Sequence, residues 1–124
     1  MTNQPINFLI ILFLCSTSFL SAQTVFGKWK TIDDRTGKPK GIINIYEKDG
    51  EMYGYVEEIL EEDKKGAVCI KCDGELKNKP IVGMEIIKGG EKNDDGEWKG
   101  KHLFDPEQAM TFRFKLWLNP DSPN

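Results

Sequence analysis

The chain has 124 residues, which allows one domain at most. Its 17 Lys and Arg and 20 Asp and Glu residues give a net charge of −3. Because no basic stripe in the sequence could neutralise phosphates, nucleic acid is not expected as a partner. The sequence also holds no basic amphipathic helix of the kind that binds a membrane surface.

The N-terminal segment has the pattern of a cleavable export signal. Residues 8–15 read FLIILFLC, an unbroken apolar run, and small and polar residues follow as far as Ala22. Ala22 is the expected last residue before cleavage. The basic flank typical of such signals is absent, since residues 1–7 contain no Lys or Arg. We expect residues 1–22 to be removed and the mature protein to be exported, either periplasmic or secreted.

Other interpretations of this segment are less well supported. A membrane anchor needs about 20 mostly apolar residues, whereas this run is short and is followed by hydroxyl side chains. A lipoprotein signal would use Cys15, but the preceding residues 12–14 lack the small side chain that such processing needs. A buried helix of the mature fold would show an alternating polar face, which is missing here. We therefore expect no membrane span after cleavage.

The rest of the chain predicts β-strands joined by turns. Asp49-Gly50 is a strong hairpin signal, because both central residues of a type I′ turn need positive φ. The clearest alternation is in the last strand, where Phe112, Phe114 and two leucines share one face. The expected strands cover six segments: residues 25–32, 41–48, 52–60, 81–88, 97–104 and 112–118.

Strands in this order, without convincing helices, indicate an all-β antiparallel meander. Such a sheet must bury one face, and curling into a barrel does so while removing exposed edges. The Gly27-x-Trp29 pattern on the first strand resembles lipocalin-like barrels, in which the tryptophan closes one end. We expect residues 23–118 to form one lipocalin-like β domain and residues 119–124 to form a polar tail.

Three stretches resemble a family of exported bacterial proteins called domain of unknown function 2147. They are VFGKWKTIDD at residues 25–34, AVCIKC running into GELKNKPIVG at residues 67–83, and the Trp98-x-Gly100 strand followed by Asp105-Pro106. The resemblance covers nearly all of residues 25–118. It implies export and a lipocalin-like antiparallel barrel, and it brings no catalytic residues because the role of the family is unsettled.

The C-terminal end departs from the family pattern. Members usually continue past the last predicted strand into two more strands, whereas here the polar residues 119–124 follow. We therefore expect a barrel that is incomplete or open at its C-terminal end, or an edge covered by another chain. An open edge would favour self-association or a protein partner.

Cys69 and Cys72 are expected to form a disulfide in an oxidising compartment. The closed loop is short, so on the chain-entropy model the bond contributes only about 2 kcal/mol. A redox-active dithiol would need a lowered thiol pKa, and Lys71 is the only nearby cation before Asp73. Asp73 also stands where covalent haem needs histidine, and zinc would need two further ligands although His102 is the only histidine.

No catalytic residue, cofactor or metal site is predicted. No nucleophile motif accompanies His102, and the acidic residues 57–63 lack the spacing of a calcium loop. Aromatic side chains could line a ligand pocket or simply form the core; these are Trp29, Tyr46, Tyr53, Tyr55 and Trp98.

From the fold resemblance and the aromatic content we expect a non-enzymatic protein that binds a small apolar ligand or an envelope component. This hypothesis rests on analogy of fold. Two alternatives stay open. One is a protein-interaction module that uses an exposed sheet edge, and the other is a thiol redox protein that uses Cys69 and Cys72.

Overall fold

The computed structural model describes residues 24–119. The expected signal at residues 1–22 and residues 120–124 of the polar tail lie outside this part. Six strands form one antiparallel sheet in chain order, which confirms the all-β meander. The strands are β1 (Gly27–Ile32), β2 (Pro39–Lys48), β3 (Glu51–Ile59), β4 (Glu85–Lys92), β5 (Trp98–Asp105) and β6 (Met110–Leu116).

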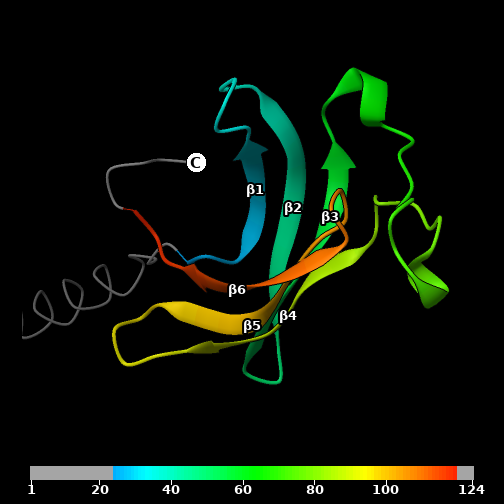
Figure 1. Cartoon of the computed structure of the whole chain (residues 1–124). Helices are drawn as coiled ribbons and strands as arrows, with labels where there is room; N and C mark the ends of the chain where they lie inside the picture. The colour runs from blue at the N-terminus through cyan, green and yellow to red at the C-terminus, as the bar shows by residue number, and fades with distance from the viewer. Residues whose placement is uncertain (1–23, 120–124) are drawn as a thin grey trace, which may run out of the picture.

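The sheet is strongly curved but open. In Figure 1 β1 to β3 run upright, whereas β4 to β6 run across them. The strand order places β1 and β6 at the two edges, and they do not pair with each other. The expectation of an open or incomplete barrel is therefore confirmed. Two short 3₁₀ turns, η1 (Glu62–Lys64) and η2 (Gly74–Leu76), lie in the long connection between β3 and β4. No helix within residues 24–119 is long and apolar enough to cross a membrane.

Local signals predicted the β2–β3 hairpin correctly. Asp49 has a φ of 53° and Gly50 a φ of 79°, as the expected type I′ turn requires. The fourth strand was misplaced: residues 81–88 were expected, but β4 begins at Glu85 and continues through the supposed turn at Gly89-Gly90. The amide of Met84 donates to the carbonyl of Ile81 at 3.0 Å, so a turn occupies the start of the expected strand. The amide of Gly83 in this turn donates to the carbonyl of Val56 at 2.7 Å.

The core forms where the curved sheet folds over its own inner face. Met52 of β3 is completely buried and Ile87 of β4 is 2% exposed. They belong to one cluster with Phe114 of β6 and Trp98 of β5. Strands from the two halves of the sheet therefore share a single core without a closing ladder.

Two glycines allow this close packing. A Cβ atom on Gly100 would lie 2.6 Å from the ring of Phe114, and one on Gly90 would lie 3.0 Å from the same ring and from Met52. Side chains at these positions would push β4 and β5 away from β6. The absence of side chains thus sets the curvature of the second half of the sheet.

Replacing Met52 with alanine should leave a cavity in the middle of this core. We expect the free energy of unfolding to fall by about 2–5 kcal/mol, since methylene groups are lost and the site cannot collapse fully. Met110→Ala is the matched control, because Met110 is 50% exposed. It should change the free energy of unfolding by less than about 0.5 kcal/mol. Equal effects of both variants in urea denaturation would contradict this description of the core.

Candidate functional site

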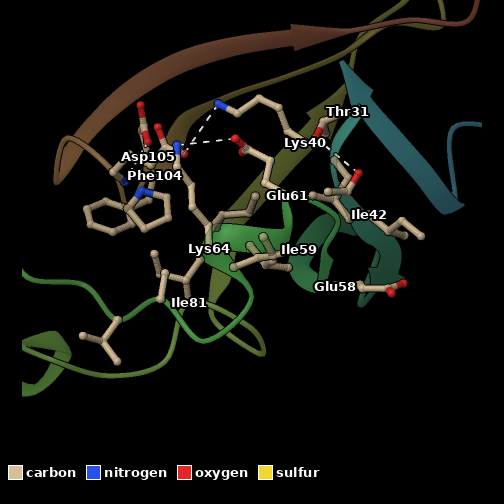
Figure 2. A pocket seen from close by; sticks show the side chains of 18 of the residues that line it. Thr31, Lys40, Ile42, Glu58, Ile59, Glu61, Lys64, Ile81, Phe104 and Asp105 are labelled. Carbon is tan, nitrogen blue, oxygen red and sulfur yellow. Dashed lines mark hydrogen bonds and ion pairs between the residues drawn. The ribbon is translucent and has the colours of Figure 1, made fainter. Parts of the chain in front are cut away.

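An apolar cavity of about 780 Å³ lies at one end of the sheet. It is found where β1, β3 and β5 end and where β2 begins. Its walls are mainly aliphatic and come from all six strands, the long β3–β4 connection and the β5–β6 turn; they include Ile42, Ile59, Val68, Ile81, Leu103 and Phe104. Figure 2 shows several of these side chains around the hollow.

A bulge in β3 lies beside two consecutive isoleucines of β2 that line this cavity. Ile42 pairs with Glu58 but Ile43 pairs with Val56, so Glu57 has no opposite residue. In a regular strand, neighbouring side chains point to opposite faces. The extra residue interrupts this alternation in β3, and Ile42 and Ile43 of the facing strand both line the cavity.

The long connection between β3 and β4 supplies the outer wall. The amide of Cys69 donates to the carbonyl of Lys79 at 2.8 Å, and the amide of Ile81 donates to the carbonyl of Ala67 at 3.0 Å. Val68 also forms a bridge with Pro80. These contacts fold the connection back on itself, and Ala67, Val68, Ile70 and Ile81 of this segment line the cavity.

Cys69 and Cys72 form the expected disulfide within this wall. Both residues are buried, at 0% and 2% exposure, and they pack with Met84. The Sγ atom of Cys69 lies 3.3 Å from the carbonyl oxygen of Pro106 in the β5–β6 turn. A thiolate outside the protein has no direct approach to sulfurs buried in this way, and this favours a structural role over thiol exchange.

Charged side chains surround the mouth. Lys40 lies 3.6 Å from Glu107, and Lys64 lies 3.4 Å from Glu61 and 4.0 Å from Glu107. Figure 2 shows the contacts of Lys40 and Lys64 above the aliphatic side chains of Ile59 and Ile81. The network joins β2, the long connection and the β5–β6 turn. The negative charges of Glu107 and then Glu61 raise the pKa of Lys64 above its ordinary value of 10.5.

None of the five predicted aromatic residues lines this cavity. Trp98 is 6% exposed and lies in the core, with its ring 5.3 Å from that of Phe26. Trp29 packs against the same core, and its Nε1 donates to the carbonyl of Val25 at 2.7 Å. Trp98 begins β5, at the opposite end from the cavity, and Trp29 lies in the middle of β1, opposite Ile43.

The three tyrosines form a separate group on the other side of the sheet. The ring of Tyr46 stacks on Tyr53 at 5.8 Å and lies 6.2 Å from Tyr55. The hydroxyl of Tyr46 donates to Glu85 at 3.1 Å. Burial and then this hydrogen bond raise the pKa of Tyr46 above 10.0. The tyrosines are therefore brought together, but away from the apolar hollow.

The residues that do line the cavity were not identified from the sequence as ligand-binding residues. Two signals were available: the consecutive pair Ile42-Ile43, and the apolar residues Val68 and Ile70 within an otherwise polar connection. His102 is half-buried and does not line this cavity. Within residues 24–119, no group of three or more His, Cys, Asp or Glu side chains could hold a metal ion.

The fold and cavity together define an open antiparallel β-meander with an apolar hollow at one end. The profile of a bacterial family, described as uncharacterized protein conserved in bacteria (DUF2147), matches residues 27–123. The chain belongs to this family, which confirms the resemblance found in the sequence. No curated protein and no solved structure matches the chain.

The charge network at the mouth predicts a specific titration behaviour. Replacing Glu107 with glutamine should lower the pKa of Lys64 toward 10.5, because the largest favourable charge is removed. Because the pKa of Lys64 is higher in the folded protein than in the unfolded chain, protonated Lys64 stabilises the fold below pH 10.5. This contribution is lost as the pH rises through the pKa of Lys64 in the folded protein. NMR titration of the Lys64 side chain measures the shift directly.

Glu62→Gln is the matched control, since Glu62 pairs with Lys65 at 3.2 Å and not with Lys64. It should leave the titration of Lys64 unchanged. If the pKa of Lys64 responds equally to both substitutions, Glu107 does not hold the network together.

Proposed function

We propose that the protein is an exported, non-enzymatic binding protein that takes up a small apolar ligand, or the apolar part of an envelope component, in this cavity. The observation that carries the proposal is an open hollow of about 780 Å³ with mainly aliphatic walls. Ligand pockets commonly enclose about 300–1,000 Å³ and are lined mostly by apolar side chains.

Exposed apolar side chains at the mouth also support binding. Ile70 is 69% exposed, Phe112 is 41% exposed and Val68 is 37% exposed, and all three line the cavity. A ligand that covers them removes apolar surface from water, which is worth roughly 25 cal/mol per Å² before the costs of association. These side chains therefore provide a driving force that a fully closed core would lack.

The polar groups indicate how the ligand is oriented. No polar or charged residue within residues 24–119 is buried, so the cavity interior offers shape and apolar contact. At the mouth, Lys40 is paired with Glu107 and Lys64 with Glu61. A neutral apolar body inside, with any polar end directed toward the mouth, fits this distribution.

Export is supported by two observations of different kinds. Residues 1–22 have the pattern of a signal, and the Cys69–Cys72 disulfide suits an oxidising compartment. The matching family is described only as conserved in bacteria. This description is compatible with either a periplasmic or a secreted site of action.

Ligand binding can be tested with a fluorescent fatty-acid analogue added to the purified mature protein. Phe112→Asp should weaken binding by about tenfold or more, since it places a charge at the apolar wall. Met110→Asp is the matched control because Met110 lies on the same strand, is 50% exposed and does not line the cavity. It should change the dissociation constant by less than about twofold.

Organic extraction followed by mass spectrometry tests the same proposal without a probe. Lipid or another apolar compound should be recovered from the protein as purified. If no such compound is recovered and no apolar probe binds, ligand binding in this cavity must be abandoned.

A second candidate is protein association through the sheet edges. β1 and β6 each pair with one neighbour only, and apolar side chains near these edges are exposed: Ile32 at 49% and Met110 at 50%. A strand from another chain could extend the sheet at either edge. A strictly monomeric protein without a co-purifying partner would remove this candidate.

A further inference from the structure

Basic side chains gather around a shallow hollow on β4, β5 and β6. We call this surface the basic face; its cationic residues are Lys88, Lys92, Lys99, Lys101, Arg113 and Lys115. They are six of the 17 Lys and Arg residues in a chain whose net charge is −3. Glu91 is the one carboxylate that lines the hollow, and His102 lies beside it. The positive charge is therefore concentrated locally against the sign of the whole protein.

The strand register brings like charges together on this face. Lys99 of β5 pairs directly opposite Lys115 of β6, and like charges at opposite positions destabilise a sheet. Glu91 is opposite Lys99 on the other side, but no ion pair joins them. Lys115 has a carboxylate partner, Glu97, at 3.4 Å. Among the described residues, the other five cations of the basic face form no ion pair.

Glu97 responds to this local charge. A hydrogen bond from Asn93 is the largest cause that holds its pKa below 4.5, and the charges of Lys115 and Lys99 lower it further. Glu91 and Glu97 are the carboxylates beside the six cations, so positive charge remains in excess on this face. An external anion would relieve the repulsion between Lys99 and Lys115.

An exposed tryptophan follows the basic residues on β6. Trp117 is 59% exposed and lies just beyond the end of β6. It lines a neighbouring hollow that shares Lys92 with the basic face and also holds Asp95 and Glu97. Tryptophan is enriched where a protein meets the headgroup region of a membrane, because its ring is apolar and its N–H is polar. A dissolved anion would gain nothing from this ring, whereas a lipid surface would.

We propose that the basic face binds a membrane surface rich in anionic phospholipid, with Trp117 at the level of the headgroups. The sequence contains no basic run or basic amphipathic helix, and for that reason such a surface was not expected. The fold assembles it from three separate strands. The hollow shares no lining residue with the apolar cavity, so this proposal does not depend on ligand binding there.

Co-sedimentation of the mature protein with lipid vesicles tests the proposal. The protein should bind vesicles that contain phosphatidylglycerol, bind pure phosphatidylcholine vesicles much more weakly, and dissociate as salt is added. Each lysine near an anionic surface contributes about fivefold to the partition coefficient. Lys99→Gln combined with Lys101→Gln should therefore weaken binding by about twentyfold.

Lys38→Gln combined with Lys48→Gln is the matched control. It removes the same charge from exposed lysines that form no ion pair and do not line the hollow. The control should bind within about twofold of the unchanged protein. Trp117→Ala should weaken binding while keeping the salt dependence, because it removes the ring and no charge.

Three results would overturn the proposal. One is equal binding to both kinds of vesicle, and another is an equal loss in the control variant. The third is salt-sensitive binding to single-stranded DNA without binding to vesicles, which would assign the face to a different polyanion. The salt dependence of vesicle binding by the unchanged protein tests the proposal even if a variant fails to fold.

Discussion

The contact of the Phe114 ring with the backbone of Gly90 and Gly100 determines how the sheet closes on itself. Side chains at these two positions would come within 3.0 and 2.6 Å of the ring. Met52 enters the same space from β3 and is completely buried. The two halves of the sheet are joined by the β3–β4 ladder and by this packing, since β1 and β6 do not pair.

Both ends of the curved sheet are hollowed, and they differ in the chemistry of their side chains. Phe26 and Trp98 meet edge to face at one end, at 5.3 Å, and Trp29 is fixed there by its hydrogen bond to Val25. The other end is lined mainly by smaller aliphatic side chains such as Ile59 and is left hollow. The disulfide-bonded connection between β3 and β4 covers this end as a wall and leaves a mouth. What distinguishes the apolar cavity from the hollow at the aromatic end is its mainly aliphatic lining.

Features that depend on neighbouring residues were predictable from the sequence. The turn at Asp49 and Gly50 and the disulfide between Cys69 and Cys72 follow from a few adjacent residues, and both are present. The start of β4 was not predictable, because the long-range hydrogen bond from Gly83 to Val56 determines it. Local propensity contains no information about that contact.

The functional surfaces were harder to predict for the same reason. The cavity takes aliphatic residues from several strands, and each of them has an ordinary core character when considered alone. The basic face takes Lys99, Arg113 and Lys115 from two strands that the sequence separates by a turn. The sequence indicated aromatic residues as possible pocket residues instead, but Trp98 belongs to the core and Tyr46 to a cluster elsewhere on the sheet.

Methyl NMR of isoleucine-labelled protein tests the central claim, that the aliphatic hollow binds an apolar ligand, most directly. Ile42, Ile59 and Ile81 line the cavity, whereas Ile45 is buried in the core and Ile32 is exposed near the β1 edge. Addition of a fatty-acid analogue should shift the methyl signals of the first three and leave those of Ile45 and Ile32 in place. Shifts that are largest at Ile32, or no shifts at saturating ligand, would contradict the account.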